Sequence, residues 1–423
     1  MTNINKAVKN DHSLIIGGGI VGAALALKLA QAGHGVTLID ARPKMSAENW
    51  QQKLTQRDAR VYALSLASIE LLKEVGAWQL ICHSGRKADY NQMLVWQKDG
   101  HGELQFGETK GVPQLLGSMV EPIVIEYALW QRMQDAQISQ NLQVIRGQKV
   151  TAMDWLGSED GYQISLDNGE KITAPLVVGA DGRGSFVRCQ ASITLDTLDY
   201  HQTAICCAIH TEKPHQHIAR QAMLPTGTLA LLPLADITDE DKANPQHWQS
   251  VVWTLPSNQA LDMLTATDEQ IANNLAAASG YELGSIEQIE SVASFPLTAQ
   301  QAKSYIKENL VLVGDAAHGV HPLAGQGLNL GLLDVVALYD LLRQDYQRSG
   351  KRLWGHLQTL QQYERQRRPH NSLMMHSFSA MNWLFAGEFA ALRPVQQLRS
   401  EGMYQVGQIK PLMRLFTKKA SGL

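Results

Sequence analysis

SLIIGGGIVG, residues 13–22, runs from a short apolar segment into a glycine-rich turn. An alanine- and leucine-rich segment, Ala23 to Ala32, follows and is ended by Gly33. A second β-branched run, Val36 to Ile39, then closes at Asp40. Strand, glycine turn, buried helix and strand in this order predict a βαβ unit.

The glycine spacing of this turn is typical of a dinucleotide site. Gly17 permits a tight turn, Gly19 lets a pyrophosphate approach the backbone, and Gly22 allows the helix to lie close to the strand. The phosphates would lie at the positive end of the helix. Asp40 can accept hydrogen bonds from ribose hydroxyls, and its charge disfavours a 2′-phosphate. We therefore expect NAD or FAD; the alternative is a glycine turn that serves packing alone.

A second acidic residue, far along the chain, helps to distinguish FAD from NAD as the expected cofactor. Gly314-Asp315 follows the apolar run Leu310 to Val313, and a carboxylate there can bind the hydroxyls of a ribityl chain, which NAD lacks. The run Gly325-Gln326-Gly327-Leu328-Asn329 opens a helix whose free N–H groups would face the pyrimidine edge of a flavin. Negative charge gathers at that edge on reduction, so the helix end would stabilise it. These features favour FAD.

Two further motifs suit a flavin site but also have plainer explanations. Asp181 follows the buried run Leu176 to Val178; it either contacts the cofactor or, with Ser185, caps its own turn. Arg60, in the stretch Asp58 to Ser65, either binds a phosphate or the flavin, or forms a surface salt bridge.

The apolar runs predict an α/β fold with a Rossmann-like FAD-binding domain and its mostly parallel sheet, a β-sheet substrate domain, and a helical C-terminus. Continuous apolar runs are typical of buried parallel strands, whereas the alternation in residues 249–254 indicates an antiparallel sheet. We expect the FAD domain to be discontinuous, drawn from residues 1–81, 121–190 and 296–350. The substrate domain would comprise residues 82–120 and 191–295. Residues 351–423 would form the helical region, with breaks near Pro369, Pro394 and Pro411.

Composition argues against several classes of protein. The 423 residues carry 37 Lys and Arg against 40 Asp and Glu, a net charge of −3, so no global charge attracts nucleic acid. The four cysteines include no C-x-x-C pair, which indicates free thiols in a reducing compartment. The N-terminus lacks the apolar core of a signal peptide. The longest apolar stretch, Leu14 to Leu27, is shorter than the ~20 residues of a membrane span. We expect a cytoplasmic protein that binds no nucleic acid.

The sequence predicts no metal site and nominates no catalytic residue. His318 and His321 are three residues apart, but nothing resembles the ligand clusters of iron or copper. Five side chains of the expected substrate domain could act as bases, but ordinary sheet or surface positions explain each of them, so we nominate none: Tyr200, His201, His210, His215 and His217.

Taken in order, these motifs resemble the FAD-dependent aromatic hydroxylases of the para-hydroxybenzoate hydroxylase type, and within them the ubiquinone-biosynthesis hydroxylases. The similarity extends from about residue 12 to about residue 415. Three stretches carry it: Asp58 to Ser65, Val120-Glu121-Pro122 before Tyr127-Ala128-Leu129-Trp130, and His321 to Gly331. Segments 211–221 and 229–234 are most similar to the subfamily that hydroxylates 2-polyprenylphenols at ring position C5.

The resemblance implies a monooxygenase that binds FAD and hydroxylates the aromatic ring of a polyprenylated phenol in ubiquinone biosynthesis. NADPH or NADH would reduce the FAD, O₂ would give a flavin C4a-hydroperoxide, and its distal oxygen would pass to the ring. A dry site would protect that species. The implied FAD contacts are Gly17, Gly19, Gly22, Asp40, Arg60, Asp181, Gly314, Asp315, Gly325, Gln326, Gly327, Leu328 and Asn329.

Three positions depart from the family pattern. Asp40 stands where Glu is usual and is one methylene shorter, so its ribose contact is expected to be looser or bridged by water. Pro122 replaces a usual Asn and removes an amide near the cofactor. Gly319 replaces a common Thr and removes a hydroxyl.

Other functions on the same scaffold stay open. A different ring position, another phenolic substrate, or a flavin dehydrogenase would use the same motifs. So would a flavin-bearing assembly subunit of the biosynthetic complex with little turnover. A flavin-dependent halogenase is disfavoured because its W-x-W-x-I-P signature is absent.

The C-terminal region is both basic and apolar. Between residues 393 and 419 one acid, Glu401, stands against six basic residues: Arg393, Arg399, Lys410, Arg414, Lys418 and Lys419. The simplest interpretation is a helical subdomain that packs on the FAD domain with a solvated basic face. The alternative is a surface for other ubiquinone-biosynthesis proteins or for peripheral contact with the inner face of an anionic membrane, where a polyprenyl substrate would lie.

Overall fold

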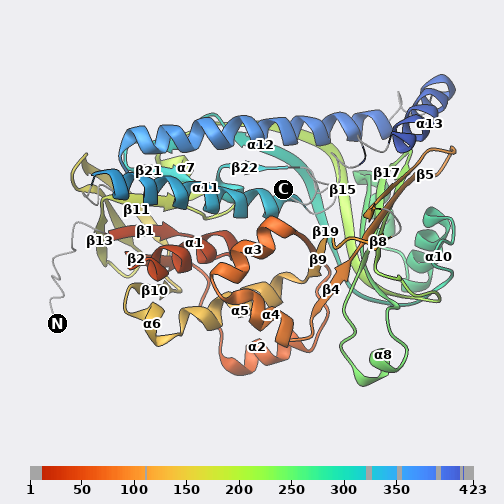
Figure 1. The fold of residues 1–423 in the computed structure, drawn as a ribbon, viewed down its shortest axis with the longest axis horizontal. Helices are drawn as coiled ribbons and strands as arrows, with labels where there is room; N and C mark the ends of the chain where they lie inside the picture. The colour runs from red at the N-terminus through yellow and green to blue at the C-terminus, as the bar shows by residue number, and fades with distance from the viewer. Residues whose placement is uncertain are drawn as a thin grey trace.

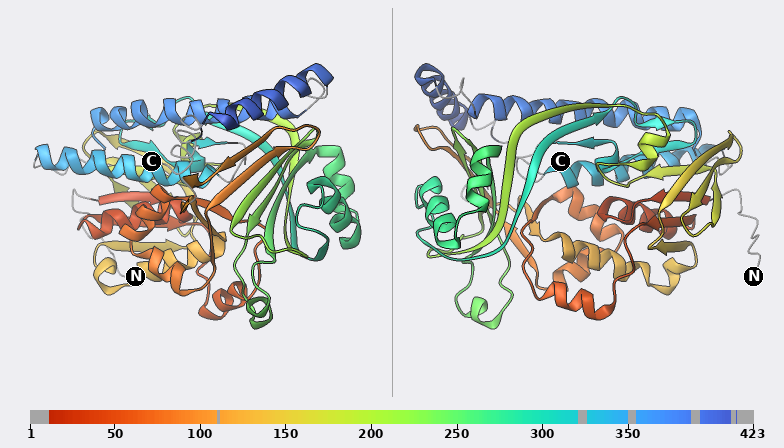
Figure 2. Two further views of the ribbon diagram at one scale, coloured as in Figure 1. Left: turned by 45° about the vertical axis from the view of Figure 1, so that its right-hand side comes forward. Right: turned by 180° about the vertical axis from the view of Figure 1, so that it is seen from behind.

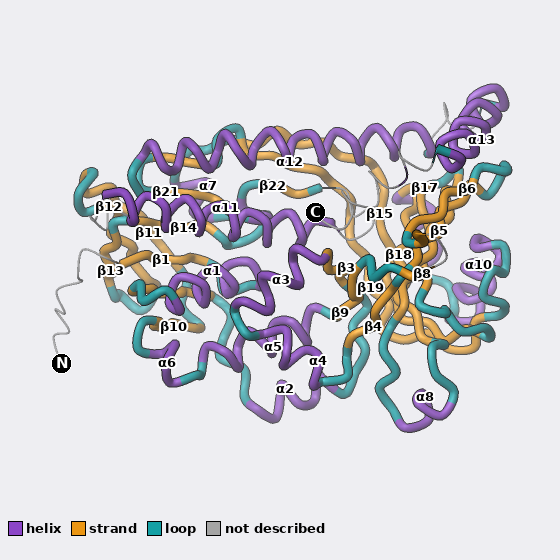
Figure 3. Tube along the Cα trace, in the orientation of Figure 1, coloured by secondary structure: helices purple, strands orange, loops and turns teal. Residues whose placement is uncertain are grey.

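A computed structural model of the chain describes residues 12–109, 112–320, 326–349, 355–386, 392–409 and 413. A parallel sheet with its helices lies beside a large antiparallel sheet, and a long helix extends along both (Figure 1). Most helices lie around the parallel sheet, whereas the antiparallel strands gather at the opposite end (Figure 3). This arrangement confirms the predicted fold class.

Six strands form the parallel sheet in the order β10-β2-β1-β14-β21-β20. Their bounds are β1 His12–Ile16, β2 Gly35–Asp40, β10 Leu142–Arg146, β14 Leu176–Gly179, β20 Ile306–Lys307 and β21 Leu310–Leu312. All neighbours are parallel except β20, which pairs antiparallel with β21. Strands from distant parts of the chain therefore lie side by side, and the four apolar runs predicted as parallel strands are confirmed.

The first helix, α1 (Ile20–Gln31), is buried on nearly every side. It contacts β2 and also α11 (Gln326–Ser349), so it lies between strand and helix. This position explains why its sequence is rich in Ala and Leu all round rather than along one stripe. The helix predicted at 23–32 is confirmed, and so is the helix predicted to begin within the run 325–329.

Eight strands form the second sheet in the order β22-β19-β15-β18-β17-β16-β5-β6. Their bounds are β5 Gln92–Gln97, β6 Glu103–Phe106, β15 Leu195–Thr211, β16 Ile218–Leu224, β17 Gly227–Pro233, β18 Trp248–Pro256, β19 Ile286–Ala302 and β22 His318–Gly319. Only β5 and β16 pair in parallel. The long strands β15 and β19 curve from this sheet toward the parallel one (Figure 2), where β19 pairs with β22.

The remaining elements connect or cover these sheets. The strands are β3 Tyr62–Ser65, β4 Lys87–Tyr90, β7 Glu108–Thr109, β8 Val112–Pro113, β9 Gly117–Val120, β11 Val150–Gly157, β12 Gly161–Leu166 and β13 Lys171–Ala174. The helices are α2 Ala47–Leu54, α3 Leu66–Glu74, α4 Ala77–His83, α5 Pro122–Met133, α6 Ala136–Ser139, α7 Phe186–Gln190, α8 Asp239–Ala243, α9 Ser257–Leu264, α10 Asp268–Ser279 and the 3₁₀ turn Gly314–Ala316.

The long helix α12 (Leu357–Phe385) corrects one prediction, because it continues through Pro369. A proline inside a helix loses one hydrogen bond and usually kinks it. Here Arg367 and Asn371, on either side of Pro369, both bond to the buried carboxylate of Asp334, which holds the helix in place across the proline. Tertiary contacts thus outweigh the local signal.

The last described helix is α13 (Arg393–Gln408), and Pro394 lies in its first turn, so the break predicted there is confirmed. The break predicted near Pro411 lies outside the described residues. Within the described part of the chain, no helix is both long and apolar enough to span a membrane.

Candidate active site

The glycine turn after β1 has room only where a phosphate would need it. A Cβ on Gly17 would lie 2.2 Å from the carbonyl oxygen of Ala180, and Gly17 itself has a φ of +110°. A Cβ on Gly22 would lie 2.0 Å from the carbonyl oxygen of Gly17. A Cβ on Gly19 would meet nothing within 4 Å. The turn is therefore closed where helix and strand touch and open on the side expected to face a pyrophosphate.

The start of α1 offers unused donors to an anion. Gly19 is its N-cap and supplies no side-chain cap, and the first turn contains no acidic residue. The first N–H groups of a helix have no partner within the helix, and they carry its positive partial charge. This helix end fits the pyrophosphate of a dinucleotide.

Asp40 ends β2 beside this turn, and its carboxylate is bound by Arg42. The backbone N–H of Arg42 donates to Oδ1 over 3.0 Å and its guanidinium donates to Oδ2 over 2.9 Å. The same guanidinium also bonds to Glu126 and to the carbonyl oxygen of Gly18. Burial alone would lower the pKa of Arg42, but Asp40 and Glu126 raise it above its ordinary value. A ribose contact by Asp40, still a prediction, must therefore share this carboxylate with Arg42, which sequence analysis did not single out.

A cavity of about 620 Å³ lies between the two large sheets. Its cofactor side is lined by Gly19 of the glycine turn, Arg60, Asp315, and Gly327 and Leu328 of α11. The structure thus brings residues predicted from three distant motifs to one cavity.

Asp315 follows β21 in the short 3₁₀ turn and lines this cavity. Its side chain is exposed to the cavity, but desolvation by the surrounding protein raises its pKa, and the charges of His318, Arg183 and Arg60 offset only part of that rise. Its neighbour Gly314 has a φ of +57°, which suits glycine. A carboxylate held here fits hydrogen bonding to a polyol chain.

Gly319, where the resemblance leads us to expect Thr, lies against Arg183. A Cβ at this position would be 3.0 Å from the guanidinium of Arg183. That guanidinium donates to the backbone and side-chain oxygens of Thr298, both over 2.6 Å. The glycine therefore leaves space that Arg183 uses at the edge of the cavity.

Asp181 and Asn329 direct their side chains to the protein. Asp181 accepts hydrogen bonds from the hydroxyl of Ser185 and the backbone of Val187, so the capped turn considered above is present. Asn329 is 3% exposed and bonds to Ala63, Ser65, Ser68 and Gln326. Contacts of these residues with FAD remain predictions, and Gly325 lies outside the described residues.

A buried carboxylate behind the cavity was missed by sequence analysis. Asp334 of α11 is fully buried and accepts hydrogen bonds from His318 over 2.5 Å, Arg367 over 2.7 Å and the backbone of Gly314 over 3.1 Å. Burial alone would raise its pKa, but His318 and Arg367 lower it to about 2. An acidic residue inside an apolar helix pattern was the only available signal. Asp334 fixes the turn that carries Asp315.

His318 is thus a partner of Asp334, and His321 lies outside the described residues. Among the residues that the structure describes, no group of His, Cys, Asp and Glu is arranged to hold a metal ion. His318 instead bonds to Asp334, which also accepts a hydrogen bond from the backbone of the turn at Gly314.

The far wall of the cavity is apolar. It is formed by side chains two residues apart on neighbouring strands, the spacing at which strand residues share one face: Ala204, Cys206, Ala230, Leu232, Val252, Phe295 and Leu297. Burial raises the pKa of Cys206 to about 12, so its thiol is neutral. None of these wall residues carries a charge, and the arrangement fits an uncharged ring.

None of the five side chains considered as bases lines this cavity. Tyr200 bonds to Ser379 over 2.6 Å and His210 to Glu287 over 2.9 Å. Burial lowers the pKa of His215 to about 4, so this residue is neutral at physiological pH. Tyr62, which no sequence motif marks as a base, does line the cavity, and burial raises its pKa.

The fold and the cavity fit a flavoprotein, because an open glycine turn, the carboxylate of Asp315 and an apolar wall meet in one cavity. Residues 12–377 match the family described as FAD binding domain. The chain therefore belongs to this family, and within it to the ubiquinone-biosynthesis hydroxylases, which are FAD-dependent aromatic-ring monooxygenases that use NAD(P)H and O₂.

Two curated relatives cover nearly the whole chain. One is the 3-demethoxyubiquinol 3-hydroxylase of Escherichia coli (strain K12), 34% identical over 415 residues, with 97% of this chain and 98% of that protein covered. The other is the ubiquinone hydroxylase UbiL of Rhodospirillum rubrum, 36% identical, with 97% and 89% covered. The fold is similar to that of p-nitrophenol 4-monooxygenase PnpA from Pseudomonas putida DLL-E4, with a TM-score of 0.72 at 16% identity over 96% of each chain.

Proposed function

We propose that this enzyme hydroxylates the aromatic ring of a polyprenylated phenol on the route to ubiquinone. The observation that carries the proposal is the single cavity that joins the glycine turn and Asp315 to an uncharged wall of small and apolar side chains. The two curated relatives, a 3-demethoxyubiquinol 3-hydroxylase and a ubiquinone hydroxylase, support the substrate class.

The roles of the chain's own residues follow from their places. The glycine turn and the start of α1 would hold the pyrophosphate of FAD, and Asp315 the ribityl hydroxyls. When bound, FAD supplies the activation of O₂ after accepting two electrons from NAD(P)H. Residues such as Leu232 and Phe295 would orient the ring and exclude water. In the balanced reaction one oxygen atom replaces a ring hydrogen as hydroxyl and the other leaves as water.

This proposal is tested by turnover of the purified FAD-loaded protein with a short-chain prenylphenol. The phenol is expected to accelerate NAD(P)H oxidation and to yield a product heavier by one oxygen, whose position on the ring is read by NMR. A product oxidised without added oxygen would indicate a flavin dehydrogenase. Binding of FAD without turnover of any phenol would indicate an assembly subunit.

We also propose peripheral contact of the C-terminal helices with an anionic membrane at its inner face. The second half of α12 and α13 expose large apolar side chains: Leu373, Met381, Trp383, Leu384, Leu392, Leu398, Tyr404 and Ile409. One predicted basic residue does not belong to this surface, because Arg399 is buried against Phe385 and bonds to Gln97. Lys410, Arg414, Lys418 and Lys419 lie outside the described residues.

Flotation with anionic liposomes tests this contact. The wild type is expected to float, and replacing Trp383 and Leu398, 60% and 76% exposed, by serine is expected to reduce the floating fraction several-fold. Replacing Leu261 of α9, which is 64% exposed, by serine is the matched control and should change nothing. Lack of flotation by the wild type, or an equal loss in the control, would contradict membrane contact and leave a partner protein of the pathway as the occupant.

A further inference from the structure

The loop between α2 and β3, residues 55–61, carries Arg60 to the cavity. The guanidinium of Arg60 lies 4.7 Å from the centre of the Phe295 ring. In the described part of the chain, no carboxylate within ion-pair distance holds this guanidinium. The place of Arg60 therefore depends on how the backbone of its loop is anchored.

One set of anchors comes from the side of the parallel sheet. Arg86 donates to the carbonyl oxygens of Leu54 and Gln56. Its guanidinium also donates from Nε to Glu121 over 2.9 Å. The other oxygen of Glu121 accepts from the backbone N–H of Asp58 over 2.7 Å. The buried pair of Arg86 and Glu121 therefore holds the loop on the side of the parallel sheet.

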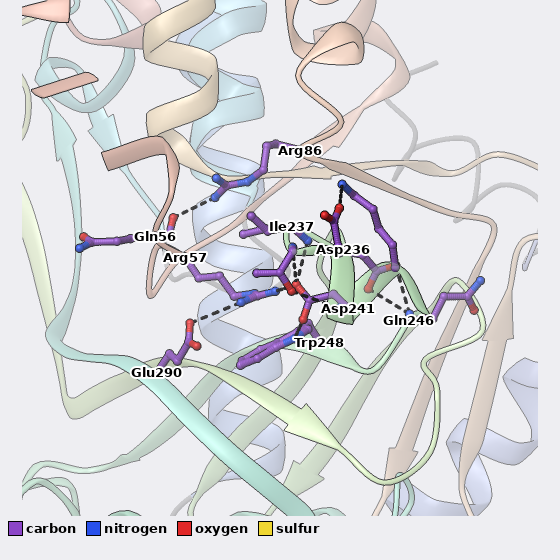
Figure 4. A network of polar contacts seen from close by, with 12 residues as sticks. Gln56, Arg57, Arg86, Asp236, Ile237, Asp241, Gln246, Trp248 and Glu290 are labelled. Carbon is purple, nitrogen blue, oxygen red and sulfur yellow. Dashed lines mark hydrogen bonds and ion pairs between the residues drawn. The ribbon is translucent and has the colours of Figure 1, made fainter. Parts of the chain in front are cut away.

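The second set of anchors comes from the antiparallel sheet and centres on Arg57 (Figure 4). Arg57 is 8% exposed, and its guanidinium lies 3.6 Å from the centre of the Trp248 ring. It donates to Oδ2 of Asp241 over 2.6 Å, while Nε1 of Trp248 donates to Oδ1 over 2.7 Å. A weaker ion pair joins Arg57 to Glu290 over 3.5 Å.

Asp241 is itself held rigidly in α8. The backbone N–H groups of Ile237 and Thr238 donate to it, and Thr238 completes a capping box. Burial alone would raise the pKa of Asp241, but these hydrogen bonds and that of Trp248 lower it, so the carboxylate stays charged opposite Arg57. Ser291 of β19 adds a hydrogen bond to the carbonyl oxygen of Arg57 over 2.6 Å.

We propose that Arg57 is a positioning residue, which fixes the position of Arg60 relative to both sheets. Strands β18 and β19 supply anchors of the loop, Trp248 and Ser291, and also parts of the ring-binding wall, Val252 and Phe295. A displacement of this sheet would thus be transmitted through Arg57 to Arg60. Arg57 couples the wall that receives the ring to the side of the cavity that receives FAD.

Two variants of the FAD-loaded full chain test this coupling. Arg57→Lys keeps the charge but loses the planar guanidinium that stacks on Trp248 and bonds to Asp241. Asp241→Asn removes the charge of the partner while keeping its shape. The matched control is Lys242→Gln, which breaks an exposed ion pair with Asp239 on the same helix. The measurements are KM and kcat with a short-chain prenylphenol, hydrogen peroxide released per NAD(P)H consumed, and quenching of flavin fluorescence by iodide.

Both variants are expected to keep FAD but to raise KM or the hydrogen peroxide fraction roughly 10-fold, because small misplacements near reacting atoms are costly. The flavin should also become more accessible to iodide, and Lys242→Gln should match the wild type. The proposal would be overturned if both the yield of hydrogen peroxide per NAD(P)H and the quenching of flavin fluorescence by iodide were unchanged. The proposal would also be overturned if the variants melted at a lower temperature and gave less active protein, while the active molecules kept a normal KM and a normal yield of hydrogen peroxide per NAD(P)H. The choice of phenol rests on the proposed function; if the wild type does not use it, the iodide comparison still decides the role of Arg57.

Discussion

At the scale of single residues, Asp315 is the side chain on which we predict cofactor binding to depend most. It lines the cavity directly after β21, and the backbone that carries it is fixed by Asp334. A carboxylate that accepts hydrogen bonds from hydroxyl groups contributes about 1.5 to 3 kcal/mol when it is charged. Desolvation by the surrounding protein raises the pKa of Asp315, so FAD binding is expected to weaken as the pH falls into the acid range.

Replacing Asp315 by alanine is therefore expected to raise the dissociation constant of FAD by about 10- to 100-fold. Recovery of flavin fluorescence on dilution measures it. Asp340→Ala is the control, because Asp340 is an exposed carboxylate on α11. Purified Asp315→Ala protein that retains a full flavin spectrum after extensive dialysis would show that Asp315 has no such role.

Residue patterns predict the site where the contacts are local, and fail where partners are distant in sequence. Gly17, Gly19 and Gly22 are readable because strand, turn and helix follow one another within a few residues. Arg57 and Arg86 are not, because their partners Asp241 and Glu121 lie 184 and 35 residues away along the chain. A single arginine in a loop gives no indication of such a partner.

At the scale of elements, α11 and α12 form the support behind the cofactor side of the cavity. Asp334 of α11 joins His318, the turn at Gly314, and Arg367 of α12. Since these contacts join four elements, they also explain why α12 continues through Pro369. The break predicted there followed the local rule for proline, which contains no information about Asp334.

Asp334→Asn is expected to lower stability at neutral pH by about 3–5 kcal/mol, because Arg367 would remain buried without its counter-charge. The pKa of Asp334 is lowered from 3.8 to about 2 in the folded state. Its charge therefore contributes stability that is complete above pH 3.8 and is lost as the pH falls toward 2. The difference in melting temperature between wild type and variant should thus be largest near pH 7 and shrink below pH 4.

Asp340→Asn, on the exposed side of the same helix, is the control and should follow the wild type at every pH. A gap between wild type and Asp334→Asn that stays constant down to pH 2 would contradict a charged Asp334.

At the scale of the whole molecule, the active cavity lies where two sheets meet and a single helix extends along both (Figure 1). At one end of α12, Tyr363 donates to the backbone of Leu312 in the parallel sheet. At the other end, Asn382 bonds to Gln202 of the antiparallel sheet over 3.0 Å. The α/β class and its parallel strands can be predicted from the apolar runs. The bridging of the two sheets by α12 cannot, because it rests on hydrogen-bonded pairs that no sequence pattern indicates.

Because the cofactor side and the apolar wall meet in one cavity, we propose that oxygen is inserted into a ring held there. The measurement that tests this most directly is turnover of the FAD-loaded protein with NADPH and a short-chain prenylphenol under ¹⁸O₂, followed by mass spectrometry of the product. We predict one ¹⁸O atom in the new phenolic hydroxyl and none when the label is supplied as H₂¹⁸O. An oxidised product without ¹⁸O from O₂ would contradict the assignment as a monooxygenase.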